Sequence, residues 1–331
     1  MKIYAAVIGT GIGLKHIDAI NNYKNSKVLL VYEKNKKKSL KLRKVFPNIK
    51  FVNSENEIFS NKKINLISIA SYDNYHFKQI LLCLKRDINV IIEKPICLKF
   101  EELIKIREAL RQSKSKITSN MVLRVNDLFC KIKKMINPKN IYYMEGDYIW
   151  GRKEKIFGWR SKIKNFSFTL GAAIHIIDLI CWFLNEKPIS IVSFGNNLIT
   201  KKTKFKKKSF LIYILKFPNQ KIVKITANMV GIHEHFHDIK IFTSKNTYIH
   251  NYNKTFKIIK KKNKFKNINL NYKYPDKLNR KKMIHNFIDH LYNKRIKQII
   301  TEKEIFDLMS ICFAADDSLK QKKEVKIKYL K

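Results

Sequence analysis

The sequence predicts an α/β protein of two domains, in which a doubly wound parallel sheet is followed by an α+β domain built on a largely antiparallel open sheet. The 331 residues exceed what one hydrophobic core comfortably holds. Apolar strands alternate with helices in the first part of the chain, and this alternation stops near Leu123, where strands begin to follow one another. We therefore expect one domain over residues 1–122 and a second over residues 123–331.

Short apolar runs bounded by glycine or polar residues predict the strands of the first domain, and amphipathic segments between them predict its helices. The expected strands are residues 3–8, 28–32, 51–52, 64–70, 90–92 and 117–122. The expected helices are residues 16–21, 39–45, 76–85 and 100–113. Continuous apolar strands that alternate with helices are typical of a parallel sheet covered on both faces, with right-handed crossovers.

The second domain begins with a strongly apolar helix and continues as a series of strands. The helix is expected at residues 171–184, and two more at residues 280–292 and 302–318. The expected strands are residues 189–194, 210–217, 222–229, 238–243 and 247–250. Hairpin-like connections such as residues 217–220 favour antiparallel pairing.

The net charge of +43 suggests nucleic-acid binding, but its distribution argues against a specific nucleic-acid site. Base and phosphate readers are preferentially arginine, whereas nearly all the cations here are lysines spread along the whole chain. The densest runs, residues 34–38, 201–208 and 254–266, are expected in loops or exposed strand edges. The hydrophobic content of 45% excludes a disordered chain, and no apolar run is long enough to span a membrane.

Cysteine usage indicates a reduced compartment. The five cysteines are an odd number, widely spaced and mostly in apolar segments, which is typical of reduced core thiols in a cytoplasm. None is paired at a metal-ligand spacing, so no metal site is expected from them; they are Cys83, Cys97, Cys130, Cys181 and Cys312. The apolar N-terminus leads directly into a glycine turn and is expected to be the first strand, not a signal sequence.

A glycine-rich turn after the first strand predicts a dinucleotide site of the Rossmann type. Between that strand and a helix, glycines let backbone amides reach a pyrophosphate. Leu14 occupies the position where the third glycine of the motif usually stands. Glycine turns also occur where close packing requires them, which is the alternative interpretation. The residues expected at the cofactor are Gly9, Thr10, Gly11, Ile12 and Gly13.

Glu33 ends the second predicted strand, 24 residues after Gly9, where a carboxylate accepts hydrogen bonds from the adenosine ribose. A carboxylate there repels a 2′-phosphate, so NAD is favoured. Lys34 and Lys36 leave NADP open, and a solvated acid at a strand end is the alternative interpretation of Glu33.

The stretch Glu93-Lys94-Pro95 follows the apolar run 88–92 and so presents a lysine at the carboxyl end of a strand. In open α/β sheets that edge is where ligands bind. A structural lysine at a turn is the alternative.

Together with the glycine turn, five motifs resemble the Gfo/Idh/MocA family of oxidoreductases, the glucose-fructose oxidoreductase and inositol dehydrogenase group. Each is weak alone, but their order and spacing are specific; they are residues 68–76, 93–95, 146–152, 158–160 and 171–178. The resemblance implies a Rossmann domain, a nicotinamide cofactor, and substrates that are sugars, cyclitols or sugar nucleotides. It also implies a cis Lys94–Pro95 peptide. We further expect a homodimer or homotetramer.

The resemblance carries roles to individual residues. Lys94 matches the family's catalytic lysine and His175 its catalytic histidine, although a histidine on an apolar helix is more often a core residue. Asp178 follows His175 on the same helix face and is expected to orient the imidazole or bind a substrate hydroxyl. Five residues are also expected at the cofactor: Ala70, Ser71, His76, Glu93 and Lys94.

One position departs from the family pattern. Inositol dehydrogenase-like members carry an acid four residues before the histidine, where this chain has Gly171. A complete Lys-Asp-His triad therefore cannot be transferred, and an inositol substrate is disfavoured. The glycine-rich approach to His175 is more similar to members associated with surface-polysaccharide or sugar-nucleotide pathways.

A cluster of aromatic and guanidinium groups is expected to bind the substrate. Aromatic rings stack on sugars and arginine binds carboxylates or phosphates, so Tyr148, Arg152, Trp159 and Arg160 suit an anionic sugar or a nucleotide sugar. A packed aromatic corner is the alternative. His233, His235 and His237 alternate and could in principle bind a metal, but a role on the sheet face or at a subunit interface is favoured.

These observations predict an NAD(P)-dependent oxidoreductase that transfers hydride between nicotinamide and a secondary alcohol or ketone of a sugar or sugar nucleotide, in surface-polysaccharide biosynthesis. Two alternatives stay open. One is an enzyme that uses bound NAD without net redox, of the epimerase or glycosidase type. The other is a catalytically silent dinucleotide-binding sensor.

Overall fold

The computed structural model describes residues 2–252, 254–261, 264–270 and 279–330. The chain forms two compact units. The first comprises Met1–Val122 and Lys277–Phe306, and the second Leu123–Asp276 and Asp307–Lys331. The first boundary between the two units along the chain falls between Val122 and Leu123. The assignment of residues 277–306 to the second domain needs correction, because they group with the first unit.

The first unit contains a six-stranded sheet in the order β3-β2-β1-β4-β5-β6, with every pair parallel. The predicted doubly wound sheet is thereby confirmed. Its strands are β1 (Ile3–Ile8), β2 (Ser26–Tyr32), β3 (Lys50–Val52), β4 (Leu66–Ile69), β5 (Asn89–Ile92) and β6 (Ile117–Ser119). The strand order reverses between β1 and β4, and ligands of such sheets bind beside that reversal, at the carboxyl ends of the strands.

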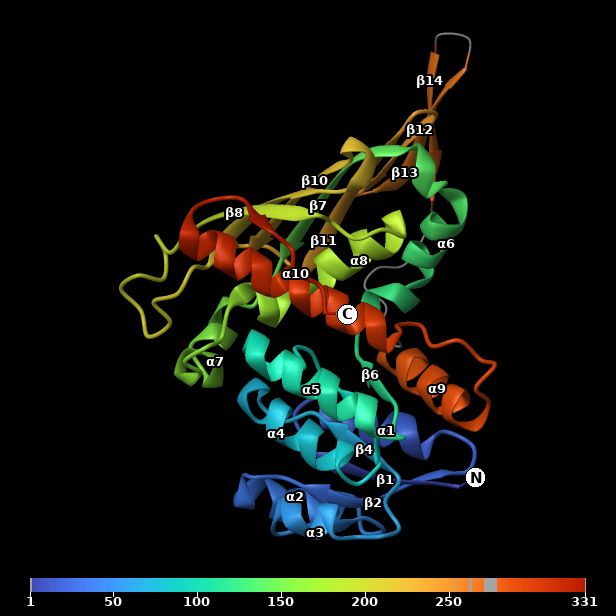
Figure 1. The fold of residues 1–331 in the computed structure, drawn as a ribbon, viewed down its shortest axis with the longest axis vertical. Coiled ribbons are helices and arrows are strands. Elements are labelled where there is room, and N and C mark those ends of the chain that lie inside the picture. The colour runs from blue at the N-terminus through green and yellow to red at the C-terminus, as the bar shows by residue number, and fades with distance from the viewer. Residues whose placement is uncertain (1, 253, 262–263, 271–278, 331) are drawn as a thin grey trace. The chain divides into compact units, whose positions relative to one another are not determined.

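Helices cover the sheet on both sides (Figure 1). They are α1 (Gly13–Asn21), α2 (Lys36–Val45), α3 (Glu55–Phe59), α4 (Asp73–Leu84), α5 (Phe100–Gln112) and α9 (Asn279–Tyr292). Helix α9 joins this unit because its apolar face shares a core with α1: Ile284, Phe287 and Ile288 are buried in one cluster with Ile17 and Ile20. Sequence periodicity predicted α9 but could not predict which core it enters.

The second unit is built on a nine-stranded sheet in the order β14-β13-β12-β11-β7-β10-β9-β8-β15. Only the β7–β10 pairing is parallel among the described strands, which confirms the largely antiparallel sheet. The strands are β7 (Ile141–Ile149), β8 (Ser190–Asn196), β9 (Phe210–Lys216), β10 (Ile222–Asn228), β11 (Phe236–Thr243), β12 (Asn246–His250), β13 (Thr255–Lys261), β14 (Lys264–Asn269) and β15 (Val325–Lys326).

The helices of the second unit include α6 (Asp127–Met135), α7 (Trp159–Lys162), α8 (Ile174–Leu184) and α10 (Glu302–Gln321), which begins in the first unit. Helix α8 packs against β7, where a Cβ at Gly146 would lie 2.9 Å from the Ile176 side chain and 2.8 Å from that of Ile180. Gly146 therefore permits the close approach of helix and strand (Figure 1).

Several elements were not predicted from the sequence, chiefly helices α3 and α6 and strands β7, β13 and β14. The lysine run 34–38 enters helix α2, which begins at Lys36. Most of the described part of the run 254–266 lies in β13 and β14, and the described side chains of β14 are exposed. No helix of the described residues is long and apolar enough to cross a membrane.

Candidate active-site residues

The glycine turn after β1 has the geometry of a pyrophosphate site. Gly9 has a φ of +88°, and a Cβ there would lie 2.5 Å from the Ala70 carbonyl oxygen, so only glycine fits. A Cβ at Gly11 would meet nothing within 4 Å, which leaves open space in front of the turn. Helix α1 begins two residues later at Gly13 and directs its first amides toward that side. The turn therefore fits a nicotinamide dinucleotide.

Glu33 is tied to the glycine turn. Its Oε2 accepts a hydrogen bond from the Thr10 amide at 3.1 Å and another from the Thr10 hydroxyl, and its Oε1 accepts one from the Asn35 amide at 2.9 Å. Lys38 Nζ lies 3.4 Å from Oε2. Burial raises the pKa of Glu33, but the hydrogen bonds from Thr10 and Asn35 and the charge of Lys38 outweigh it, so the net pKa is lowered. A charged acceptor thus stands beside the turn, as a ribose site requires.

A buried polar network lies beneath the Glu93-Lys94-Pro95 turn. His16 is fully buried, with Nδ1 2.6 Å from the Ser68 hydroxyl and Nε2 3.0 Å from Glu93 Oε1. The same Glu93 oxygen accepts hydrogen bonds from Asn120 Nδ2 at 3.0 Å and Arg280 Nε at 2.9 Å. Side chains from three separate segments of the first unit therefore converge on one carboxylate oxygen.

This network keeps Glu93 ionised. Burial raises its pKa, yet the Arg280 charge and the hydrogen bond and charge of His16 outweigh the burial, so the pKa lies well below its usual value. Glu93 was predicted to contact the cofactor, but its Oε1 is occupied by these internal partners. Its role in the structure is to fix the turn that carries Lys94, whose peptide bond to Pro95 is cis, as predicted.

His76 also bridges two segments of the first unit. Its ring is fully buried, with Nδ1 2.7 Å from the Pro95 carbonyl oxygen and Nε2 3.2 Å from that of Ser71. The imidazole joins the loop after β4 to the turn after β5, which differs from the cofactor contact expected of it. Ser71 Oγ donates to Gln79, and Ala70 is buried beside Gly9.

His175 lies in the second unit, in the first turn of α8 and directly after a π-helical turn, Thr169–Ala173. A single helical pattern was predicted over residues 171–184. π-turns are rare and occur often at functional sites. A Cβ at Gly171 would lie 2.5 Å from the Phe166 ring, so this ring fills the space that an acid at Gly171 would need.

Hydroxyl groups and a buried acid hold the π-helical turn. Thr169 Oγ1 donates to Asp316 Oδ1 at 2.5 Å and lies 2.9 Å from the Tyr213 hydroxyl. Burial raises the pKa of Asp316 to about 6, although hydrogen bonds from Ser167 and Thr169 act in the opposite direction. Helix α10 thereby anchors the segment that precedes His175.

Asp178 forms a buried ion pair with Arg124. Arg124 Nε lies 2.9 and 3.1 Å from the two carboxylate oxygens, and Arg124 Nη2 lies 2.7 Å from Oδ1. The side chains are 3% and 2% exposed. Sequence reasoning expected Asp178 to orient His175 or bind a hydroxyl, whereas the structure engages both oxygens with a residue 54 positions earlier.

The predicted substrate cluster is partly assembled. The Arg160 guanidinium lies 4.2 Å from the Trp159 ring centre and 5.4 Å from that of Trp150. Tyr148 is buried, and the charges of Arg152 and Arg160 oppose the rise that burial causes in its pKa. The structure thus places cations near an aromatic group.

A third cation, which sequence reasoning missed, belongs to this cluster. Burial lowers the pKa of Lys155, and the charges of Arg152 and Arg160 lower it further. Three cations that repel one another form an environment suited to an anion.

The alternating histidines divide between surface and core. His235 and His237 pack edge-on against Tyr148, with ring centres 5.4 and 4.7 Å away, while His233 is exposed. Burial and the Arg152 charge lower the pKa of His235 to about 4. Within the described ranges no group of three or more His, Cys, Asp or Glu side chains is arranged to hold a metal ion.

Residues 3–121 match the model of the Gfo/Idh/MocA family, an oxidoreductase family with an NAD-binding Rossmann fold. This match confirms the resemblance carried by the sequence motifs and the prediction of a nicotinamide cofactor. The choice between NAD and NADP stays a prediction.

Solved structures share the fold over nearly the whole chain. The scyllo-inositol dehydrogenase of Lactobacillus casei, solved with NAD(H) and scyllo-inositol, has a TM-score of 0.79 at 16% identity and covers 98% of this chain and 99% of its own. The UDP-N-acetylglucosamine 3-dehydrogenase of Acidithiobacillus ferrooxidans has a TM-score of 0.79 at 14% identity, covering 97% and 99%. At these identities the similarity is one of fold.

Among curated proteins, the 2,7-anhydro-N-acetylneuraminate hydratase of Escherichia coli is 20% identical over 225 residues, 66% of this chain and 60% of the hydratase. The chain spans about half the length of the curated relatives that it matches. The match to the Gfo/Idh/MocA family model covers residues 3–121, and it therefore applies to the first part of the chain.

Proposed function

We propose that the protein is an NAD(P)-dependent oxidoreductase that transfers hydride between nicotinamide and a secondary alcohol or ketone of a sugar or sugar nucleotide. The observation that carries the proposal is the turn holding Lys94. It follows β5, at the strand edge where such sheets bind ligands, and the buried Glu93 network beneath it fixes its position. A lysine carried by a fixed turn at this edge is suited to proton transfer.

Oxidation of a secondary alcohol removes a hydroxyl proton and a hydride from the same carbinol group. When bound, the nicotinamide takes up that hydride. Lys94 takes the hydroxyl proton as the C=O bond forms, and in the reverse direction it returns the proton to the oxygen. His175 is retained as a candidate catalytic residue, as the family resemblance implies. Because Arg124 pairs with Asp178, we assign this aspartate a role in supporting the helix that carries His175.

The substrate class follows from the cations near Tyr148. Arg152, Lys155 and Arg160 suit a phosphate or carboxylate, and Trp159 offers a ring face for a sugar. The Phe166 ring against Gly171 leaves no room for the acid of inositol dehydrogenase-like members. We therefore propose a sugar nucleotide or an acidic sugar as substrate, in surface-polysaccharide biosynthesis, and a homodimer or homotetramer as the working form.

The test is NADH formation, followed by absorbance, with UDP-sugars, uronic acids and myo-inositol at equal concentrations. We expect turnover with a charged sugar and little with myo-inositol. Arg160→Ala should raise KM for the charged sugar by about tenfold, while Arg295→Ala, an exposed arginine of the first unit, should not. Faster oxidation of myo-inositol than of every charged sugar would refute this substrate class.

A non-redox use of bound NAD is the second candidate, because one curated relative is a hydratase. In such an enzyme the hydride is taken from the substrate and returned to it, so NADH does not accumulate. Product analysis by mass spectrometry, run beside the absorbance assay, distinguishes the two. Substrate conversion without stoichiometric NADH would favour the second candidate.

A further inference from the structure

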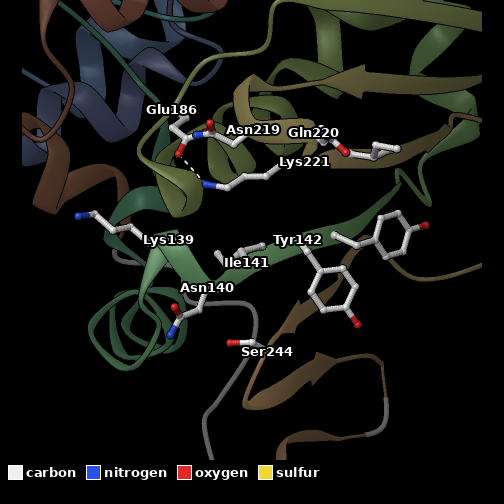
Figure 2. Close-up of a pocket in the computed structure, with 11 residues that line it drawn as sticks. Lys139, Asn140, Ile141, Tyr142, Glu186, Asn219, Gln220, Lys221 and Ser244 are labelled. Carbon is white, nitrogen blue, oxygen red and sulfur yellow. Dashed lines mark hydrogen bonds and ion pairs between the residues drawn. The ribbon is translucent and has the colours of Figure 1, made fainter.

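A cavity lies in the second unit at the amino ends of β7 and β10, with a volume of about 930 Å³. Its lining comes from four separate segments: residues 139–143, Glu186, residues 219–222 and Ser244 (Figure 2). Volumes of this size are typical of small-molecule sites. The cavity is separate from the residues discussed above.

Helix α8 indicates how far the cavity lies from His175. The helix starts at Ile174, beside His175, and ends at Leu184, two residues before Glu186. At 1.5 Å per residue this places Glu186 roughly 15 Å away along the helix axis. The strand β7 runs in the opposite sense, with Tyr142 at the cavity near its start and Tyr148 near its end. The cavity is therefore a second location within the unit.

A buried ion pair forms one wall. Lys221 is 6% exposed, and its Nζ donates to Glu186 Oε1 at 2.6 Å and to the Pro138 carbonyl oxygen at 3.2 Å. The second carboxylate oxygen of Glu186 is buried and has no hydrogen-bond partner among the described residues. A buried acceptor without a donor is destabilising.

An aromatic platform forms another wall. Tyr143 pairs with Phe242, and Ile141 with Thr243, so Tyr142 is an additional residue bulged out of the β7–β11 ladder. The bulge leaves the Tyr142 side chain 59% exposed at the cavity. β-Bulges often redirect a side chain beside a functional site.

Amide and hydroxyl groups complete the lining. Asn219 and Gln220 both have left-handed backbone conformations, with φ of 57° and 61°, and line the cavity with Asn140 and Ser244. Residues other than glycine are uncommon in this conformation and occur often at ligand sites. In Figure 2 the Glu186–Lys221 pair lies on one side of the cavity and Ser244 on the other.

We infer that this cavity binds the pyranose ring of a neutral saccharide. A sugar ring has an apolar C–H face for Tyr142, hydroxyl donors for Glu186 and hydroxyl acceptors for the side-chain amides. An apolar ligand would leave these polar groups without partners. A free anion finds little net charge at the wall, because Glu186 neutralises Lys221. A cationic ligand is opposed by Lys139.

Saturation-transfer NMR and isothermal titration calorimetry with the full chain test the inference, using maltotriose, cellotriose, methyl galactoside and N-acetylglucosamine as probes. We expect at least one probe to bind with a millimolar Kd. Tyr142→Ala should weaken binding by about tenfold or more, and Tyr142→Phe should retain it. Gln220→Ala should weaken it less. Thermal unfolding of each variant monitors the fold.

Two matched controls locate the binding. Tyr252→Ala removes another tyrosine of the second unit with 48% exposure, and Arg160→Ala alters the proposed substrate cluster. Neither should change the affinity. Lack of binding by all four saccharides, or an affinity that Tyr142→Ala leaves unchanged, would overturn the inference, as would binding that only Arg160→Ala abolishes. Because the readout is binding without turnover, its failure leaves the proposed oxidoreductase function untouched.

Discussion

The two units hold their candidate catalytic residues by different means. In the first unit, one carboxylate, Glu93, gathers a histidine, an amide and an arginine beneath the turn of Lys94. In the second unit, a buried ion pair and a hydroxyl network anchor the helix of His175. The first arrangement is a shared network with a partly exposed member, Arg280, whereas the Asp178–Arg124 pair is almost fully buried.

This difference has an energetic consequence. Removing one member of a shared network leaves the others with partners, and a partly exposed cation can turn to water. Removing one member of an almost fully buried ion pair leaves its partner's charge in a medium of low dielectric constant without that counter-charge. Chemistry should therefore be most sensitive in the first unit and stability in the second.

The largest expected effect is on turnover in the first unit. Lys94→Ala removes the proposed proton-transfer group and should lower kcat by about two to four orders of magnitude while leaving NAD binding nearly unchanged. Steady-state kinetics and a fluorescence titration with NADH measure both. Lys99→Ala, an exposed lysine of the same segment, is the matched control. A near-normal kcat for Lys94→Ala would remove the lysine from the mechanism.

The next effect is on stability in the second unit. Asp178→Ala leaves Arg124 buried without its carboxylate and should cost about 3–5 kcal/mol of unfolding free energy. Urea denaturation measures the change. Asp317→Ala, at an exposed position of α10, should stay within about 0.5 kcal/mol. A double variant, Arg124→Met with Asp178→Leu, should recover much of the loss; equal stability of Asp178→Ala and the unmodified protein would contradict the account.

The contrast also shows what the sequence could predict. Local features sufficed for the sheet, the glycine turn, the Glu93-Lys94-Pro95 turn and the helix of His175, because each is a continuous pattern of polarity or glycine. The partners of Glu93 could not be predicted, since Arg280 lies 187 positions away. A buried histidine on the amphipathic helix α1, three residues after Gly13, was the only local indication of that network.

Other misses have the same cause. Asp178 has the spacing of a residue that supports His175, and only the fold reveals that Arg124 occupies it. The predicted domain of α9 was wrong because periodicity defines an apolar face of a helix but not the surface that this face contacts. β7 escaped notice because its alternation is interrupted by Gly146 and by charged residues on the uncovered face.

A smaller effect concerns the cofactor. Glu33→Ser removes the carboxylate beside Thr10 and should shift the preference from NAD toward NADP by about tenfold, since Lys34 and Lys36 follow directly. Fluorescence titration of both proteins with both reduced cofactors measures the shift. Glu57→Ser, which alters a capping glutamate of α3, controls for a general effect on the unit. Tighter NADP than NAD binding by the unmodified protein would show that Glu33 does not select the cofactor.

The smallest expected effect concerns two neighbouring sets of cross-strand partners on one face of the second unit's sheet. Glu145 accepts ion pairs from Lys224 and Lys240, whereas Asp238 lies directly across from Asp147. Burial, and then the charge of Asp147, raise the pKa of Asp238 to about 6 from 3.8. Between these two values the folded state binds more protons than the unfolded state, so this group lowers stability as pH rises, and the loss is complete above about pH 6.

Asp238→Asn should therefore stabilise the protein at pH 8 and make no difference below about pH 4. A shift of this size corresponds to at most about 3 kcal/mol, and because the carboxyl is only half-buried, screening reduces the expected gain to about 1 kcal/mol. Glu145→Gln in the ion-paired set should have the opposite sign at pH 8, since it removes two ion pairs. Thermal unfolding from pH 4 to pH 8 measures both variants, and an Asp238→Asn gain that persisted unchanged at pH 4 would show that the carboxyl charge is not its cause.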